Sequence, residues 1–209
     1  MRLPRRRHLV LLACLVVLLV VAASASTDSA AAVSPGVAVD FVRRSCRSTE
    51  YPRVCESTLV PCAAGVGRSP RRLARAALVV GADRARNCSA YIHGADSGSG
   101  GAMKDCAELA RDAEERLRQS AAEMERMGRA GTPRFAWSLS NVQTWASAAL
   151  TDTSTCLDSL AQHQARGGGK DSDDAVRVKR RVVAVAQATS NALALVNRLQ
   201  PAPHRQRLL

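Results

Sequence analysis

The sequence is poor in aromatic residues, which make up only 3% of its 209 positions. Proline is also sparse in the central region, where Pro133 is the only one between Pro70 and Pro201. Strands favour aromatic and β-branched residues in alternation with polar ones, and no convincing segment of that kind is present. These shortages argue against a β-rich fold, whereas a region with so little proline permits long helices.

Recognisable catalytic motifs are also missing. The sequence contains no G-x-S-x-G and no H-E-x-x-H, and its four histidines are too scattered for a convincing catalytic base or zinc site. The stretch GGGKDS at 167–172 is similar to the end of a P-loop, but Gln164 and Asp171 occupy positions that require Gly and Ser/Thr. We therefore expect a protein without enzymatic activity, cofactor or metal ion, and we interpret GGGKDS as a loop between helices.

The N-terminus has the pattern of a secretory signal peptide. Arginines precede an apolar run from Leu9 to Ala23, and Ala23-Ser24-Ala25 provides the small residues of a cleavage site. The alternative, a retained membrane anchor, requires about 20 apolar residues, more than this run contains. We expect cleavage of residues 1–25, a flexible mature N-terminus at 26–36, and secretion to the cell exterior without membrane attachment.

Four segments have the period of amphipathic helices, and they alternate with short loops. The first begins with Ser69 as N-cap and Pro70 at the first helical position. The third places one stripe of residues inward: Val142, Trp145, Ala149, Thr153, Cys156 and Leu160. The expected helices cover roughly 70–92, 101–128, 135–164 and 172–199. This order predicts an all-α fold, an antiparallel up-down four-helix bundle over 69–199, followed by a tail at 201–209.

The cysteines indicate disulfides. Loss of Cys14 with the signal peptide leaves six of the seven cysteines, an even number that nevertheless allows many connectivities. Cys106 and Cys156 each lie about 25 residues from the midpoint of the loop between the second and third helices, so an antiparallel pair brings them to the same height. The alternative is two unrelated buried thiols.

A second cysteine pair, Cys46 and Cys55, forms the two ends of the sequence CRSTEYPRVC. Segments 41–46 and 51–64 are both compatible with short helices. A Cys46–Cys55 bond would join them as a small hairpin, at 37–66, ahead of the bundle.

Four stretches carry a family resemblance: FVRRSCRSTEYPRVCESTL, SPRRLARAAL, KDCAELARDAEERL and WASAALTDTSTCLDSL. Together they resemble the plant invertase and pectin methylesterase inhibitor family over about residues 37–199. The resemblance implies a disulfide-stapled helical hairpin before a four-helix bundle, with the pairs Cys46–Cys55 and Cys106–Cys156. Cys62 and Cys88 depart from the family pattern, and whether they form a third disulfide stays open.

The resemblance also implies a function. Family members are secreted plant proteins of the apoplast and cell wall that cover the active-site cleft of a partner enzyme in a one-to-one complex. Invertase inhibitors of the family typically carry Pro-Lys-Phe between the last two bundle helices, where this sequence has Lys170 without Pro or Phe. The prediction is therefore a pectin methylesterase inhibitor, with an inhibitor of acid (cell-wall or vacuolar) invertase as the alternative.

Related complexes place bundle helices across the enzyme cleft, so positions on the second and third helices that face outward or to the flanks are the candidates for contact. On the third helix the predicted contact residues are short and polar: Gln143, Ser147, Thr151, Asp152 and Ser154. The alternative is that they are ordinary solvated helix positions.

The formal net charge of +12 suggests an anionic partner. Arginines are spread over several helices, with one local cluster at 176–181, but aromatic residues for base stacking are nearly absent and the protein is expected to be exported. Pectin is therefore the more natural polyanion than nucleic acid, and a basic pectin-binding module is a further alternative. Asn87-Cys88-Ser89 is a weak glycosylation sequon.

Overall fold

A computed structural model describes residues 34–95, 101–165 and 173–200, and these residues form helices and turns without strands. The expected signal peptide, the GGGKDS loop, Lys170 and the C-terminal tail lie outside the described residues. The elements are α2 (Pro35–Cys46), α3 (Pro52–Leu59), the 3₁₀ helix η1 (Val60–Cys62), α4 (Ala63–Val66), α5 (Pro70–Ala95), α6 (Gly101–Arg126), α7 (Pro133–Ala165) and α8 (Asp173–Asn197).

No helix within the described ranges is both long enough and apolar enough to cross a membrane.

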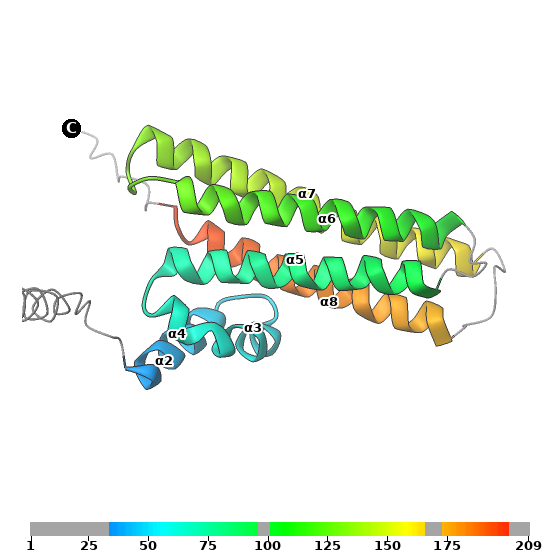
Figure 1. The fold of residues 1–209 in the computed structure, drawn as a ribbon, viewed down its shortest axis with the longest axis horizontal. Helices are drawn as coiled ribbons and strands as arrows, with labels where there is room; N and C mark the ends of the chain where they lie inside the picture. Colours follow the sequence, from blue (N-terminus) through cyan, green and yellow to red (C-terminus); the bar gives the residue numbers. More distant parts are fainter. Residues whose placement is uncertain (1–33, 96–100, 166–172, 201–209) are drawn as a thin grey trace, which may run out of the picture. The chain divides into compact units, whose positions relative to one another are not determined.

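The four long helices α5 to α8 pack as a four-helix bundle (Figure 1). The extensive contacts are between α5 and α6, α6 and α7, α7 and α8, and α5 and α8, so each helix has two neighbours and one diagonal partner. In particular, α5 lies diagonally across from α7. The predicted all-α bundle is confirmed, and its helix ends agree with the sequence pattern to within a few residues.

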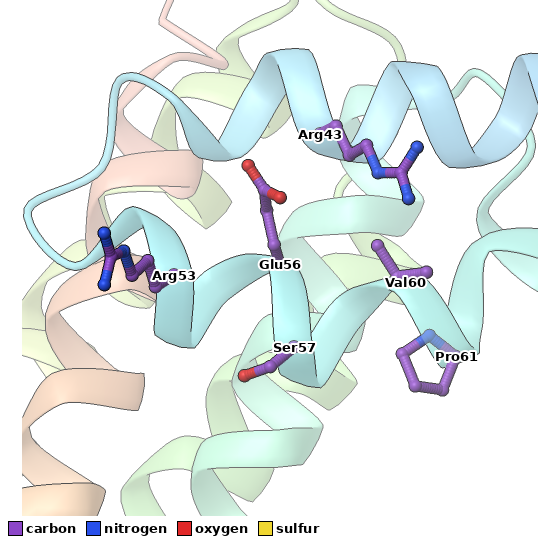
Figure 2. Close-up of a pocket in the computed structure, with 6 residues that line it drawn as sticks. All are labelled: Arg43, Arg53, Glu56, Ser57, Val60 and Pro61. Atoms are coloured by element: carbon purple, nitrogen blue, oxygen red, sulfur yellow. The ribbon is translucent and has the colours of Figure 1, made fainter.

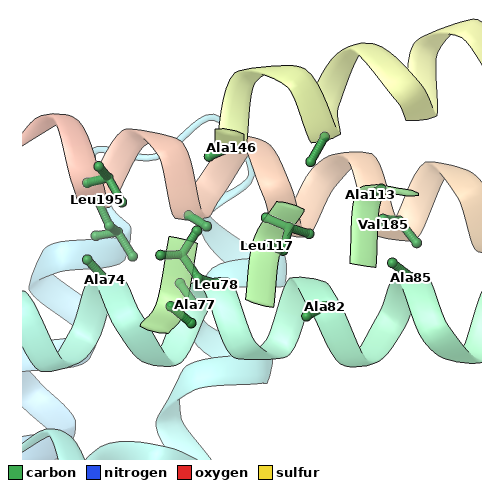
Figure 3. Packing of buried hydrophobic residues seen from close by; sticks show 14 of the residues in the cluster. Ala74, Ala77, Leu78, Ala82, Ala85, Ala113, Leu117, Ala146, Val185 and Leu195 are labelled. Carbon is green, nitrogen blue, oxygen red and sulfur yellow. The ribbon is translucent and has the colours of Figure 1, made fainter. Parts of the chain in front are cut away.

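Alanine lines much of the bundle interior. Ala74, Ala82 and Ala113 are buried beside larger side chains such as Leu78 and Leu117 (Figure 3). A methyl side chain lets neighbouring helix backbones approach closely while larger residues fill the remaining gaps. This packing explains how a chain with so few aromatic residues still buries a continuous core.

Local capping sets where α5 and α7 begin. The backbone N–H of Arg72 donates to Ser69 Oγ at 3.3 Å, which is the predicted N-cap of α5. Thr132 caps α7 in the same way, since the Phe135 N–H donates to Thr132 Oγ1 at 3.2 Å, and Pro133 is the first helical residue. The helix therefore starts two residues before the predicted position of about 135, because Thr132 caps it and Pro133 suits the first helical position, where no N–H is needed.

The predicted disulfide between α6 and α7 is present. Cys106 and Cys156 are both buried and bonded, with their α-carbons 4.7 Å apart. The equal distances of the two residues from the α6–α7 turn account for this pairing, as expected for antiparallel helices of equal rise.

The hairpin before the bundle is also stapled as the family resemblance implies, by Cys46–Cys55, with an α-carbon separation of 5.5 Å. The turn between α2 and α3 is held to α8 by Asn191. The Asn191 side chain accepts from the Tyr51 N–H and donates to the Tyr51 carbonyl, both at 3.0 Å. Arg198 adds a hydrogen bond to the Ser45 carbonyl at 3.0 Å. The hairpin is therefore docked on the bundle by polar contacts that sequence reasoning did not identify.

Candidate partner-binding surface

The outward side of α7 carries a row of hydroxyl side chains. Steps of three and four residues keep the row on one side of the helix, opposite the buried line that contains Val142, Ala149 and Cys156. We call this surface the α7 hydroxyl stripe, and its exposed members are Ser140, Thr144, Ser147, Thr151, Ser154 and Thr155.

Most of these hydroxyls bond to their own helix. Thr144 donates to the Ser140 carbonyl at 2.9 Å, and Thr151 donates to the Ser147 carbonyl at 3.2 Å. Ser154 and Thr155 donate in the same way to carbonyls one turn before them. Their donors are therefore satisfied without a partner, while the hydroxyl oxygens still have lone pairs for accepting hydrogen bonds. Such short side chains lose little rotamer entropy when another surface covers them.

The stripe is free of charge over most of its length. No ionisable residue occurs between Phe135 and Thr151, although charged residues make up 23% of the whole sequence. The neighbouring α6 alternates acidic and basic residues on its exposed side. Cores of protein–protein interfaces are depleted of charge, because burial of an unpaired charge is costly. The stripe therefore has the composition of an interface core on an otherwise strongly charged protein.

Trp137 lies at the N-terminal end of the stripe and is 65% exposed. Trp137 is not among the contact residues predicted from the sequence, although an outward tryptophan near the start of an amphipathic helix is a readable signal. Tryptophan is enriched among residues that dominate binding energy at interfaces. Trp137 therefore extends the candidate surface toward the α6–α7 turn.

The structure corrects part of the predicted contact set. Ser147, Thr151 and Ser154 are exposed as expected, whereas Asp152 is buried and forms an ion pair with Arg116 of α6. Burial raises the pKa of Asp152, and Arg116 opposes that shift. Asp152 therefore belongs to the α6–α7 packing, because it lies on the flank of α7 that faces α6.

Two further assignments on α7 also change. Gln143 is half-buried and donates to Asn197 Oδ1 of α8 at 2.9 Å, so its amide already has a partner inside the protein. Trp145 is predicted on the inward stripe and is half-buried at its edge, whereas the neighbouring Ala146 is fully buried. The buried line steps four residues from Val142 to Ala146 because the helix period is 3.6 rather than three.

The hairpin carries an open hollow of about 440 Å³, lined by residues of α2, α3 and η1 (Figure 2). Arg43 and Arg53 contribute guanidinium groups, and the carboxylate of Glu56 is directed toward α2 in the same view. Within the part of the chain that the structure describes, no three His, Cys, Asp or Glu side chains are arranged to hold a metal ion. The hollow mixes both charge signs and is wide open to solvent, so it offers no enclosed binding site.

The two remaining cysteines do not form the third disulfide that the sequence left open. Cys62 is a half-buried free thiol, and Cys88 is a free thiol that is 1% exposed. Burial raises the pKa of Cys88 to about 11, with a smaller opposing effect from Arg181. They stay apart because Cys62 ends η1, before α5 begins, whereas Cys88 lies deep within α5.

Both thiols should therefore be free in the folded, oxidised protein. Maleimide treatment of the native mature chain should modify Cys62 slowly and leave Cys88 unmodified, because only a thiolate within reach of solvent reacts. Denaturant without reductant should then expose both residues and bring the total to two labels, as measured by intact mass. Recovery of a Cys62–Cys88 cross-linked peptide from a non-reducing digest would overturn this assignment.

Asn87, the acceptor of the weak sequon, is exposed on α5. The sequon's Ser89 is buried, and its hydroxyl donates to the Ala107 carbonyl at 3.0 Å. Glycosylation of Asn87 stays a prediction.

Comparison with known proteins relates this architecture to one family. The family model for plant invertase/pectin methylesterase inhibitors matches residues 40–195, which include most of the hairpin and nearly the whole bundle. A "21 kDa protein" of Daucus carota is 39% identical over 173 residues, covering 80% of this chain and 87% of the relative. "Pectinesterase inhibitor 11" of Arabidopsis thaliana is 37% identical over 174 residues, covering 80% and 84%. "Pectinesterase inhibitor 9" of the same plant is 38% identical over 182 residues, covering 81% and 85%. With its helical bundle, its stapled hairpin and this match over most of its length, the chain belongs to the plant invertase/pectin methylesterase inhibitor family.

Proposed function

We propose that this protein inhibits pectin methylesterase by covering the enzyme's active-site cleft with the α7 hydroxyl stripe in a one-to-one complex. The observation that carries the proposal is the match of residues 40–195 to an inhibitor family, with relatives named pectinesterase inhibitors at 37% and 38% identity. Inhibition would need no chemistry from the inhibitor, because exclusion of substrate from the cleft is sufficient.

The dimensions and chemistry of α7 support this role. From Trp137 to Thr155 the surface is about 27 Å long, since an α-helix rises about 1.5 Å per residue. A complex of standard size buries about 800 Å² on each partner, so the stripe with the adjoining edge of α6 is long enough to form its centre. Trp137 would supply a large apolar contact, and the hydroxyls would supply acceptors around it.

The expected site of action is the apoplast or cell wall. The N-terminal segment has the pattern of a signal peptide, and the two disulfides require an oxidising compartment for their formation.

Titration of the oxidised mature protein into pectin methylesterase and acid invertase assays tests the proposal. We expect stoichiometric loss of methylesterase activity and unchanged invertase activity. Inhibition of invertase alone would transfer the function to the other enzyme that the family's description names. Inhibition of neither enzyme would refute the proposal.

A further inference from the structure

The first half of α8 presents arginines on one side of the helix. Arg177 and Arg181 are one turn apart, and Arg180 is adjacent to both on the helical surface, since successive residues differ by about 100°. All three are exposed. Val178 is buried, and Lys179 lies on the opposite side of it from Arg177 around the helix. Three guanidinium groups therefore share one surface, and Lys179 does not belong to it.

Contacts with α5 hold this surface in place. The Arg181 guanidinium lies over the Tyr91 ring, 4.1 Å from its centroid. A hydrogen bond with the Tyr91 side chain raises the pKa of Arg177. Further along the same seam, Arg84 of α5 donates to the Ala184 carbonyl of α8 at 3.1 Å. We call Arg84, Arg177, Arg180 and Arg181 the α8 basic face.

Few carboxylates compensate this charge. Asp173 and Asp174 precede the cluster, and the Tyr91 hydroxyl donates to Asp174 Oδ1 at 3.2 Å. Beyond Asp174, α8 contains no acidic residue. Arginines on α5 and α6 form ion pairs with aspartate or glutamate, whereas no ion pair among the described residues involves a member of the α8 basic face. Asp173 and Asp174 offset part of the charge at Arg177, and the face keeps a net positive charge.

We propose that the α8 basic face binds de-esterified pectin, an acidic polysaccharide with a carboxylate on each uronic acid residue. The choice of this polyanion rests on the proposed function, because pectin methylesterase produces these carboxylates. Guanidinium groups bind carboxylates through paired, charge-assisted hydrogen bonds. About 6 Å separates Arg177 from Arg181 along the helix, so neighbouring arginines can engage successive carboxylates of one extended chain.

This surface is separate from the α7 hydroxyl stripe. The α8 basic face lies along the seam with α5, and α5 is the helix diagonally opposite α7. The protein can therefore hold pectin while the stripe faces an enzyme. Binding of the reaction product would concentrate the inhibitor where de-esterification has already taken place.

Chromatography on immobilised de-esterified pectin tests the inference with the oxidised mature chain. The wild-type protein should be retained at low salt, released by added salt, and not retained on fully methyl-esterified pectin. The triple variant Arg177→Gln, Arg180→Gln, Arg181→Gln should bind de-esterified pectin at least tenfold more weakly. Its affinity should also depend less on salt, because fewer counterions are released on binding. All three positions are exposed, so the helical circular dichroism spectrum should be unchanged.

A charge-matched variant distinguishes the effect of this surface on pectin binding from the effect of the protein's net charge. Arg47→Gln, Arg68→Gln, Arg72→Gln removes the same charge from exposed positions at the end of the bundle that carries the hairpin, and it should keep at least half of the wild-type affinity. Equal loss of affinity in both triple variants would overturn the inference, as would wild-type affinity in the α8 variant.

Failure of the pectin-binding inference can be distinguished from failure of the proposed inhibitory function. With highly methyl-esterified pectin as the substrate, the α8 triple variant should inhibit methylesterase within about twofold of the wild type. Pectin retention that is lost in the α8 variant, in a protein that inhibits no enzyme, would support this inference while refuting the proposed function. Inhibition of methylesterase without any retention on de-esterified pectin would support the proposed function while refuting this inference.

Discussion

Replacement of Cys106 and Cys156 by alanine should lower the free energy of unfolding by about 4 kcal/mol. The disulfide closes a loop with a sequence separation of 50 residues, and the chain-entropy model predicts a loss of this size when such a loop is opened. For a domain of this length, each kcal/mol corresponds to about 2–4 °C, so the melting temperature should fall by roughly 10 °C. Thermal denaturation of the mature chain, followed by circular dichroism, measures the effect.

The hairpin disulfide provides the matched comparison. Cys46→Ala with Cys55→Ala opens a loop with a separation of only 9 residues, in a small element that Asn191 also holds to α8. We expect a smaller decrease in melting temperature and an intact helical spectrum of the bundle. A melting temperature of the Cys106→Ala, Cys156→Ala variant within about 2 °C of the wild type would contradict a stabilising role for the α6–α7 disulfide.

Introduction of arginine at Ser147 and Thr151 should weaken inhibition of pectin methylesterase at least tenfold. Both positions are exposed in the middle of the α7 hydroxyl stripe, one helical turn apart. Two long cations there would have to be desolvated and immobilised in the complex, and a tenfold effect requires only about 1.4 kcal/mol of lost binding free energy. Inhibition constants measured with purified enzyme give the result, and the helical spectrum should stay as in the wild type.

Two controls define what this result means. Asn87→Arg with Ala90→Arg adds the same charge at exposed positions of α5, diagonally opposite α7, and should leave inhibition within about twofold. Asp152→Asn should also preserve inhibition, because Asp152 is buried against Arg116 and is not available to a partner. Equal weakening by the stripe variant and the α5 variant would attribute the effect to net charge and move the contact surface elsewhere.

Helix type, approximate ends and one disulfide were predictable from the sequence because they depend on local patterns. Ser69 and Pro70 begin α5 through the cap that the sequence indicated. The long amphipathic segments have no competing strand pattern, and the pairing of Cys106 with Cys156 needs only helix rise and chain reversal. The hydroxyl character of the outer side of α7 could also be read directly, and Ser147, Thr151 and Ser154 are exposed as expected.

Whether a residue at the flank of a helix is buried was decided only by the neighbouring helices. The sequence predicts that Asp152 faces outward or to the flank of α7 and is available to a partner, whereas the approach of α6 buries it and supplies Arg116 as its partner. Trp145 and Ala146 differ by about 100° around α7, and the placement of the adjoining helices determines which of them enters the core. Periodicity specifies the centre of a buried stripe, but it does not specify the stripe's edges.

The sequence by itself determined an all-helical, disulfide-stapled protein whose composition and motifs indicate an inhibitor family. Only the tertiary structure decided how distant segments meet. Asn191 contacts the Tyr51 backbone 140 residues away, and Arg181 of α8 lies over Tyr91 of α5. It also left Cys62 and Cys88 unpaired. Local propensity and period act over a few residues along the chain, whereas these contacts depend on which helices become neighbours after the bundle closes.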